Sequence, residues 1–309
     1  MPGHLLGLRN WKMEHIQEVM ERSFFLSRYR ERKLDNLRGR LIAALFFEPS
    51  TRTKFSFEVA ARWLSADFYD FPVEMSSVVK GESLLDTILT LKSMGLNALI
   101  LRHPQSGTLE WLQNKVDITL INAGDGSHEH PTQALLDIFT IQKYFDRLKG
   151  LKVAMIGDIK HSRVVRSSIK GLREMGAEVY LVGPPTLLPD NFQETGAKVG
   201  SSLEEVIKEA DVVYLLRLQR ERQQAGLLPS LEEYSQLYGL SVERLLLLKE
   251  GAMVMHPGPL NIGVEITQEA LDKLHTSPPA GITVSIQRQV ENGIIVRAAL
   301  LDFLLKGDD

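Results

Sequence analysis

The chain alternates short apolar runs with longer stretches of helical periodicity, and this alternation restricts the fold more than any other feature. The runs "LIAALFF", "VAMIGD" and "DVVYLL" begin at residues 41, 153 and 211, and a stretch with helical spacing of apolar residues follows the first two of them. Such a succession of strands and helices predicts parallel sheets covered by helices on both faces. We therefore expect an α/β fold with two doubly wound parallel-sheet domains.

A long helix is expected to link the two domains. Pro131 is suited to a first helical turn, and the helical spacing that follows it ends by Gly150, before a second strand–helix alternation begins. With 309 residues, the chain is long for one core and sufficient for two. We expect a first domain at 1–131, a second at 132–287, and a C-terminal helix at 288–309 that packs back on the first domain. An irregular loop is expected from about residue 219 to residue 241.

Charge and composition exclude several functional classes. The net charge is 36 − 39 = −3, which does not favour a nucleic-acid-binding protein. The absence of cysteine excludes disulfides, thiolate metal sites and a cysteine nucleophile, and it suits a reducing cytoplasm. The N-terminal residues contain no signal-peptide core, and no apolar run approaches the ~20 residues of a membrane span. We expect a cytoplasmic protein that binds neither membranes nor nucleic acids.

Polar segments follow six of the expected strands, and arginine occurs in four of them. Ligands of open parallel sheets bind at the carboxyl ends of the strands, so these segments are the candidate site. A single arginine at a strand end is usually a solvated surface charge, and only convergence of several would indicate a site. The segments are Ser50-Thr51-Arg52-Thr53, Arg102-His103, His128-Glu129-His130, His161-Ser162-Arg163, Arg217-Leu218-Gln219 and His256-Pro257-Gly258-Pro259.

The first of these segments, within "FFEPSTRTKFSFE" at residues 46–58, predicts an anion site. A hydroxyl before a helix is commonly an N-cap. Here the capping box fails, because Thr53 stands three residues after Ser50. Arg52 and Lys54 also place two positive charges in the first helical turn, where they oppose the helix macrodipole. A phosphate bound at this helix start would relieve that conflict.

Metal and nucleotide sites are less well supported by the sequence. His128-Glu129-His130 contains two possible ligands, but a third at a diagnostic spacing is not evident, and no metal is expected. At a helix start His130 is disfavoured as a cation, so it would act as a neutral N–H donor to a developing oxyanion. Gly157 stands without the other glycines of a dinucleotide-binding turn, and no P-loop occurs.

The same segments carry a resemblance to a known family. Phe46-x-Glu48-x-Ser50-Thr51-Arg52-Thr53 resembles the carbamoyl-phosphate signature of the aspartate and ornithine carbamoyltransferases. Further segments match in the same order, and the resemblance covers essentially the whole chain. They are Leu101-Arg102-His103-Pro104, His130-Pro131-Thr132-Gln133 and Arg217-x-Gln219-x-Glu221-Arg222.

Several residues favour the aspartate branch of the family. Glu48 is the residue type of that branch, whereas ornithine enzymes usually have lysine there, a cysteine in an H-C-L-P segment and a serine-methionine-glycine loop. Arginines also suit a dicarboxylate and would repel the ornithine ammonium. Two departures affect the loop that closes over carbamoyl phosphate, because Ile262 replaces an arginine and Gly258 replaces leucine or alanine.

The resemblance implies transfer of the carbamoyl group of carbamoyl phosphate to the amine of L-aspartate, an early step of de novo pyrimidine biosynthesis, without a cofactor. The catalytic residues would be Arg52, Thr53, Arg102 and His130. Carbamoyl phosphate would be held by these four residues together with Ser50, Thr51, Gln133, Pro257, Gly258 and Pro259. Aspartate would be held by Lys80, Arg163, Arg217 and Gln219.

The resemblance further implies a homotrimer or a multiple of trimers, because the family's loop that corresponds to Ser76 and Lys80 reaches the neighbouring subunit's site. A regulatory chain or another enzyme of pyrimidine synthesis is a possible partner. Two alternatives stay open at this point. One is a carbamoyltransferase that uses ornithine or an acylated ornithine, and the other is a non-catalytic phosphate or amino-acid sensor on the same fold.

Overall fold

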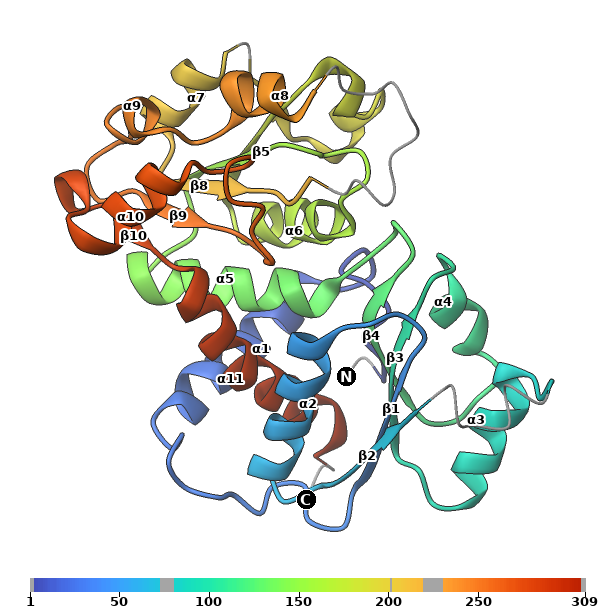
Figure 1. The fold of residues 1–309 in the computed structure, drawn as a ribbon. Helices are drawn as coiled ribbons and strands as arrows, with labels where there is room; N and C mark the ends of the chain where they lie inside the picture. Colours follow the sequence, from blue (N-terminus) through green and yellow to red (C-terminus); the bar gives the residue numbers. More distant parts are fainter. Residues whose placement is uncertain (1–2, 73–80, 201, 219–229, 307–309) are drawn as a thin grey trace. The chain divides into compact units, whose positions relative to one another are not determined.

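The computed structural model describes residues 3–72, 81–200, 202–218 and 230–306. The chain divides into two compact units, shown in Figure 1. Unit 1 comprises Met1–Phe139 and Val290–Asp309, and unit 2 comprises Thr140–Gln289. Two helices, α5 (Pro131–Phe145) and α11 (Ile286–Leu305), contribute residues to both units.

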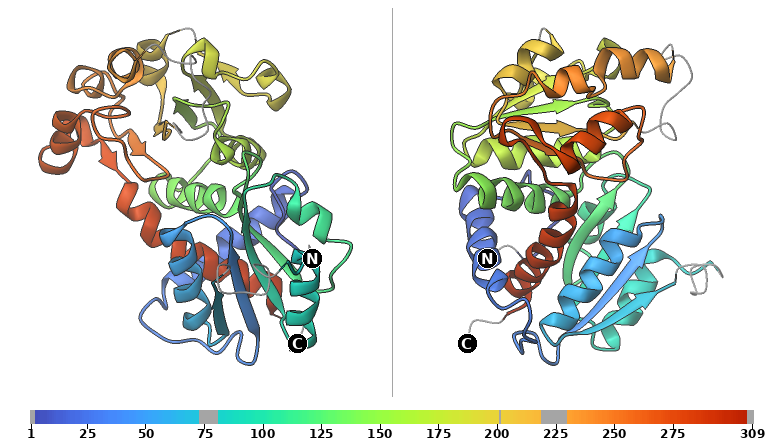
Figure 2. Two further views of the ribbon diagram at one scale, coloured as in Figure 1. Left: turned by 45° about the vertical axis from the view of Figure 1, so that its right-hand side comes forward. Right: turned by 60° about the vertical axis from the view of Figure 1, so that its left-hand side comes forward.

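Unit 1 contains a four-stranded parallel sheet in the order β2-β1-β3-β4. Helices α3 and α4 cover one face of this sheet, and α1, α2 and the unit 1 part of α11 cover the other (Figures 1 and 2). Strand β1 is apolar throughout and β3 is apolar as far as Leu101, because both faces of these central strands are buried. The elements are α1 (Met13–Ser27), β1 (Leu41–Phe46), α2 (Thr51–Trp63), β2 (Asp67–Phe71), α3 (Leu84–Ser93), β3 (Ala98–His103), α4 (Thr108–Leu112) and β4 (Thr119–Asp125).

Unit 2 contains a six-stranded parallel sheet in the order β10-β9-β8-β5-β6-β7. One face packs on α7, α9 and α10 through a continuous apolar cluster, and α6 lies on the other face (Figure 1). The strands are β5 (Lys152–Ile156), β6 (Glu178–Val182), β7 (Lys198–Val199), β8 (Val212–Leu215), β9 (Met253–Met255) and β10 (Thr283–Val284). The helices are α6 (Arg163–Glu174), α7 (Leu203–Glu209), α8 (Leu231–Tyr238), α9 (Val242–Leu245) and α10 (Gln268–Thr276), with short 3₁₀ turns at Pro185–Leu187, Phe192–Thr195 and Pro279–Gly281.

The predicted fold class is confirmed, with three differences in detail. Strand β2 was not expected, because it is an edge strand in which two aspartates interrupt the aromatic residues and no residue is buried. The linking helix ends at Phe145 and not near Gly150. Helix α8 lies where an irregular loop was expected, and it begins where the Ser230 hydroxyl accepts the Glu233 N–H at 3.0 Å. No helix in the described part of the chain is both long and apolar enough to cross a membrane.

The C-terminal helix returns to unit 1, as expected, and polar contacts fix it there. The Asp302 carboxylate on α11 accepts hydrogen bonds from Arg22 Nη1 of α1 at 2.6 Å and from Asn36 Nδ2 at 2.7 Å. Asp302 is buried, so these charge-assisted bonds are stronger than a pair at the surface. They tie α11 to the beginning of the chain.

Arg297 is a second polar anchor of α11. Its guanidinium lies 5.2 Å from the centre of the Phe57 ring on α2, and its Nη2 donates to the Thr132 hydroxyl of α5 at 3.4 Å. Burial lowers the pKa of Arg297 to about 10, against the attraction of the buried Asp137 carboxylate on α5. The side chain is therefore still charged at neutral pH, and it joins three helices of unit 1.

Replacement of Arg297 by methionine should destabilise the protein strongly. The variant keeps most of the side-chain volume but leaves Asp137 buried without the guanidinium, which typically costs about 3–5 kcal/mol of unfolding free energy. Urea unfolding followed by circular dichroism measures the loss. The double variant Arg297→Met/Asp137→Leu should be more stable than the single variant. A single variant within about 1 kcal/mol of wild type would contradict this role.

Candidate active site

Three of the predicted segments of unit 1 lie at one edge of its sheet. Two of them follow β1 and β4, and Arg102-His103 forms the end of β3; these parallel strands are adjacent, so their carboxyl ends share one edge. Phe46 at the end of β1 pairs with Arg102 on β3. The chain runs from β1 outward to β2 on one side and to β3 on the other, and such a reversal of strand order is where ligands of open parallel sheets bind.

Arg102 is held in place at this edge by neighbours from both adjacent strands. Its Nε donates to Glu48 Oε2 at 3.1 Å and its Nη1 to Ser50 Oγ at 3.2 Å, both after β1. Nη1 also lies 3.4 Å from the Ala123 carbonyl oxygen of β4. The Arg102 side chain is only 13% exposed. These contacts orient a guanidinium at the point where the sequence predicts an anion.

The Ser50 hydroxyl does not act as an N-cap of α2. Ser50 occupies the cap position, but its side chain makes no capping hydrogen bond and accepts from Arg102 instead. The first turn of α2 contains no acidic residue. The hydroxyl run is therefore not explained by ordinary capping, which agrees with the predicted anion site.

The remaining residues at the start of α2 differ in exposure. Thr51 and Arg52 are exposed and Thr53 is buried. Lys54 pairs with Asp70 of β2, with Nζ and Oδ2 2.8 Å apart. The prediction that Arg52 and Lys54 both need a bound anion is therefore wrong for Lys54, which has a counter-ion on the neighbouring strand.

His130 and Gln133 lie at the start of α5, beyond β4. His130 is buried, and its carbonyl oxygen accepts the Gln133 N–H at 3.0 Å and so begins the helix. The Gln133 Nε2 donates to Asp137 Oδ1 at 3.0 Å. This hydrogen bond fixes which end of the Gln133 amide is nitrogen and which is oxygen. The oxygen Oε1 is an acceptor, as a carbamoyl NH₂ group would require.

Three further segments lie at one edge of unit 2, after the adjacent strands β9, β8 and β5. The strand order reverses between β8 and β5, so this edge too has the position that binds ligands. Arg163 lies in the first turn of α6 after β5 and is 5% exposed, and Arg217 follows β8. His256-Pro257-Gly258-Pro259 follows β9.

Glu265 joins two of these segments, and the sequence did not identify it. Its carboxylate accepts the Leu218 N–H at 2.8 Å, the Asn261 N–H at 2.6 Å and the Asn261 side-chain amide at 2.7 Å. Glu265 is buried, and burial raises its pKa. The residue therefore fixes the backbone beside Arg217 and the loop that continues from Pro259. The sequence signal that could have identified Glu265 is an acidic residue between apolar neighbours in "GVEI".

The backbone explains one of the two departures from the family pattern. Gly258 has a φ of +65°, in the left-handed region that glycine adopts without strain. Its N–H donates to His256 Nδ1 at 2.7 Å, which turns the segment back on the end of β9. Ile262, the other departure, is 49% exposed.

Ser76, Lys80, Gln219, Glu221 and Arg222 lie outside the described residues. The described candidates fall into two groups, one at the carboxyl edge of each unit. Unit 1 holds Ser50, Thr51, Arg52, Thr53, Arg102, His130 and Gln133, and unit 2 holds Arg163, Arg217, Pro257, Gly258 and Pro259. A single site formed from both groups stays a prediction.

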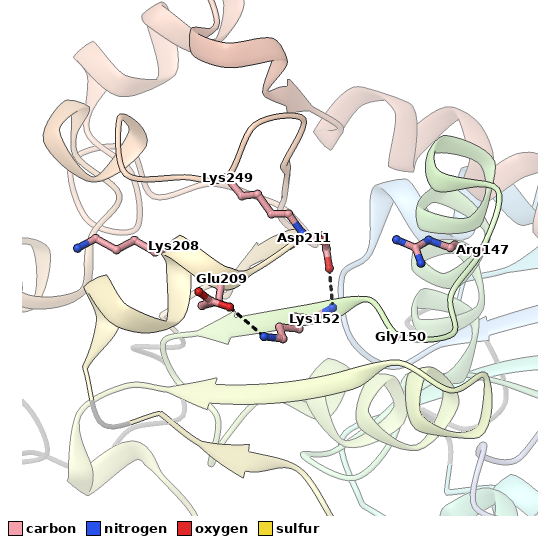
Figure 3. Close-up of a pocket in the computed structure, with 7 residues that line it drawn as sticks. All are labelled: Arg147, Gly150, Lys152, Lys208, Glu209, Asp211 and Lys249. Carbon is pink, nitrogen blue, oxygen red and sulfur yellow. Dashed lines mark hydrogen bonds and ion pairs between the residues drawn. The ribbon is translucent and has the colours of Figure 1, made fainter.

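A cavity of about 290 Å³ in unit 2 lies at the opposite edge of the sheet (Figure 3). Its lining includes Lys152 at the start of β5 and Asp211 just before β8. Lys152 pairs with Glu209 at 3.0 Å and Lys249 with Asp211 at 2.5 Å, while Lys208 points away from the other side chains (Figure 3). Its charges are thus largely paired with one another, and the cavity is distinct from the candidate site.

Comparisons with known proteins cover nearly the whole chain. Residues 3–143 match the family described as "Aspartate/ornithine carbamoyltransferase, carbamoyl-P binding domain", and residues 149–304 match "Aspartate/ornithine carbamoyltransferase, Asp/Orn binding domain". The chain is 51% identical to the aspartate carbamoyltransferase catalytic subunit of Pelotomaculum thermopropionicum, over 98% of this chain and 96% of the relative. It is 48% identical to that of Moorella thermoacetica, over 98% and 97%.

Solved structures agree with the sequence relatives. Aspartate transcarbamoylase from Trypanosoma cruzi in complex with carbamoyl phosphate has a TM-score of 0.87 and 32% identity, over 98% of this chain and 95% of that one. Ornithine carbamoyltransferase from Thermus thermophilus has a TM-score of 0.85 and 25% identity, over 99% and 100%. With two matching family domains and relatives near 50% identity, this chain belongs to the aspartate/ornithine carbamoyltransferase family.

Proposed function

We propose that the chain is an aspartate carbamoyltransferase, which transfers the carbamoyl group of carbamoyl phosphate to the amine of L-aspartate and releases phosphate. The single observation that carries this proposal is the placement of Arg102 beside the start of α2, where its Nη1 donates to the Ser50 hydroxyl at 3.2 Å. This contact brings a guanidinium from one strand to the hydroxyl-rich helix start that follows its neighbour. Relatives near 50% identity that are named for this activity support the same conclusion.

The start of α2 would hold the phosphate group. A helix N-terminus offers backbone N–H groups and a partial positive charge, and Arg52 adds a full one. The hydroxyls of Ser50, Thr51 and Thr53 supply further donors. The proton that leaves the attacking amine can pass to the departing phosphate, so no side-chain nucleophile is required.

The carbamoyl group would lie between the α2 start and α5. Negative charge develops on its oxygen in the tetrahedral transition state, and donors fixed in advance stabilise that charge without reorganising. Thr53, Arg102 and His130 would be these donors. Gln133 Oε1 and the backbone carbonyls of Pro257 and Gly258 would accept from the carbamoyl NH₂.

The carboxyl edge of unit 2 would bind aspartate. Arg163 would pair with the α-carboxylate, and Arg217 with Gln219 would bind the β-carboxylate. Arginine suits this task because its planar guanidinium binds a carboxylate through two parallel hydrogen bonds. The product would be N-carbamoyl-L-aspartate, an early intermediate of pyrimidine synthesis.

Glu48 and the two arginines of unit 2 favour aspartate over ornithine as the acceptor. The alternative is a carbamoyltransferase whose acceptor is ornithine or an acylated ornithine. Parallel colorimetric assays for carbamoylaspartate and for citrulline test this alternative. Formation of carbamoylaspartate alone, inhibited by a phosphonoacetyl-aspartate bisubstrate analogue, is the expected result. Formation of citrulline alone would assign the other acceptor, and no product from either would favour a sensor.

Replacement of Arg102 by alanine should lower kcat about 100- to 1,000-fold, because removal of one oxyanion donor has an effect of this size. Arg62→Ala is a matched control, since Arg62 donates through Nε to Glu58 at 3.0 Å but is exposed on α2. The control should keep wild-type kcat. Near-wild-type turnover of Arg102→Ala, with intact circular dichroism, would remove Arg102 from the mechanism.

We further propose that the active assembly is a homotrimer, or a multiple of trimers, in which Ser76 and Lys80 act in the neighbouring subunit's site. The basis is the resemblance of "SVVKGES" to the shared loop of the family. A lysine supplied across an interface would add positive charge to a site that binds two anions.

Mixing two inactive variants tests the shared site. Arg52→Ala and Lys80→Ala chains should each be inactive alone, and they should recover part of the wild-type activity after unfolding and refolding together. Recovery is expected because some hybrid interfaces then combine an intact Arg52 with an intact Lys80. If the mixture remains as inactive as either parent while sedimentation shows hybrid trimers, each chain carries a complete site of its own.

A further inference from the structure

A cluster of three potential metal ligands lies beside the candidate site in unit 1. It consists of Glu110 on α4, Asp125 at the end of β4 and His128 in the turn that follows. One ligand atom from each residue lies within 4.8 Å of the other two. Helix α4 packs next to β4 (Figure 1), which brings Glu110 to a turn 15 or more residues away in the chain. None of the three residues has a role in the proposed reaction.

The distances within this cluster suit a tetrahedral ion. His128 Nδ1 lies 3.1 Å from Asp125 Oδ2 and 3.8 Å from Glu110 Oε1. Zinc bonds of about 2.0–2.2 Å at tetrahedral angles place neighbouring ligand atoms about 3.4 Å apart. The two measured distances lie on either side of that value, so a small side-chain movement would complete the geometry.

Asp125 is already oriented as a ligand by its hydrogen bonds. It is fully buried, and its Oδ1 accepts the Asn122 side-chain amide at 2.8 Å and the Glu129 N–H at 3.1 Å. Its Oδ2 accepts the Gly107 N–H at 2.8 Å and faces His128. Hydrogen bonds of this kind fix metal-binding carboxylates in known sites.

Glu110 on α4 presents one of its two carboxylate oxygens to His128, and its side chain is 35% exposed. Its Oε2 is buried and accepts no hydrogen bond from any residue that the structure describes, although Oε1 faces His128. Coordination through both carboxylate oxygens of Glu110 would also satisfy Oε2, which is otherwise costly to bury.

We propose that Glu110, Asp125 and His128 bind one divalent transition-metal ion of the zinc type, with water in the fourth position. An imidazole nitrogen with two carboxylate oxygens suits zinc, whereas magnesium and calcium prefer oxygen ligands alone. The site would stiffen the turn that leads to His130.

The test uses the full chain, stripped with EDTA, desalted and titrated with zinc in a calorimeter. Wild type should bind one zinc ion per chain and gain thermal stability. Glu110→Gln and His128→Asn should each weaken binding about 10-fold or more, and the thermal shift should disappear. The matched control His275→Gln removes an exposed histidine of α10 and should bind like wild type.

Three results would overturn the proposal. One is a wild-type chain that does not bind zinc, and another is unchanged zinc affinity in both variants. The third is an equal loss of affinity in the His275→Gln control. If His128→Asn is unstable, the zinc affinity of Glu110→Gln is the test. Glu110 is partly exposed, so its amide variant can keep the fold. Tetrahedral absorption bands of the Co²⁺-loaded wild type, absent in Glu110→Gln, give a readout that is independent of activity.

Discussion

The parallel pairing of β1, β3 and β4 is the constraint on which the candidate site depends. Because parallel strands end at the same edge, residues that are about 80 positions apart in the chain lie together without any further device. Arg102 shows the result, since its guanidinium contacts the segment after β1 on one side and the backbone of β4 on the other. A change of register by one residue would turn Arg102 to the opposite face of the sheet and remove both contacts.

Both units place their candidate residues at the carboxyl edge of a parallel sheet, but the residues suit different anionic groups. In unit 1, a helix start with several hydroxyls suits a phosphate, which needs many donors around one anionic group. In unit 2, arginines after β5 and β8 suit separate carboxylates, which are bound one at a time by planar guanidinium groups. A net charge of −3 is compatible with anionic substrates because Arg52 and Arg102 lie at the edge of unit 1, and Arg163 and Arg217 at the edge of unit 2.

The sequence was sufficient for the fold class and for the strand ends, and insufficient for contacts between distant segments. Apolar runs and glycines mark strands and turns locally, so most strands of both sheets could be predicted, whereas the exposed edge strand β2 has no continuous apolar run. Glu265, and the meeting of Glu110 with His128, depend on which side chains the tertiary fold brings together. The sequence offered His128 and His130 as two possible ligands, and no metal was expected; the structure instead places Glu110 of α4 near His128 and Asp125. The countercharge of Lys54 on β2 was missed for the same reason.

Glu265 has a consequence for how acceptor preference could change within this fold. One carboxylate supports both the backbone next to Arg217 and the loop at Asn261, so the two segments share a single support. A substitution that repositions one of them for a different amino acid would also displace the other. Evolution towards a new acceptor would therefore tend to proceed by exchanging side chains on an unchanged backbone, and not by remodelling either loop separately.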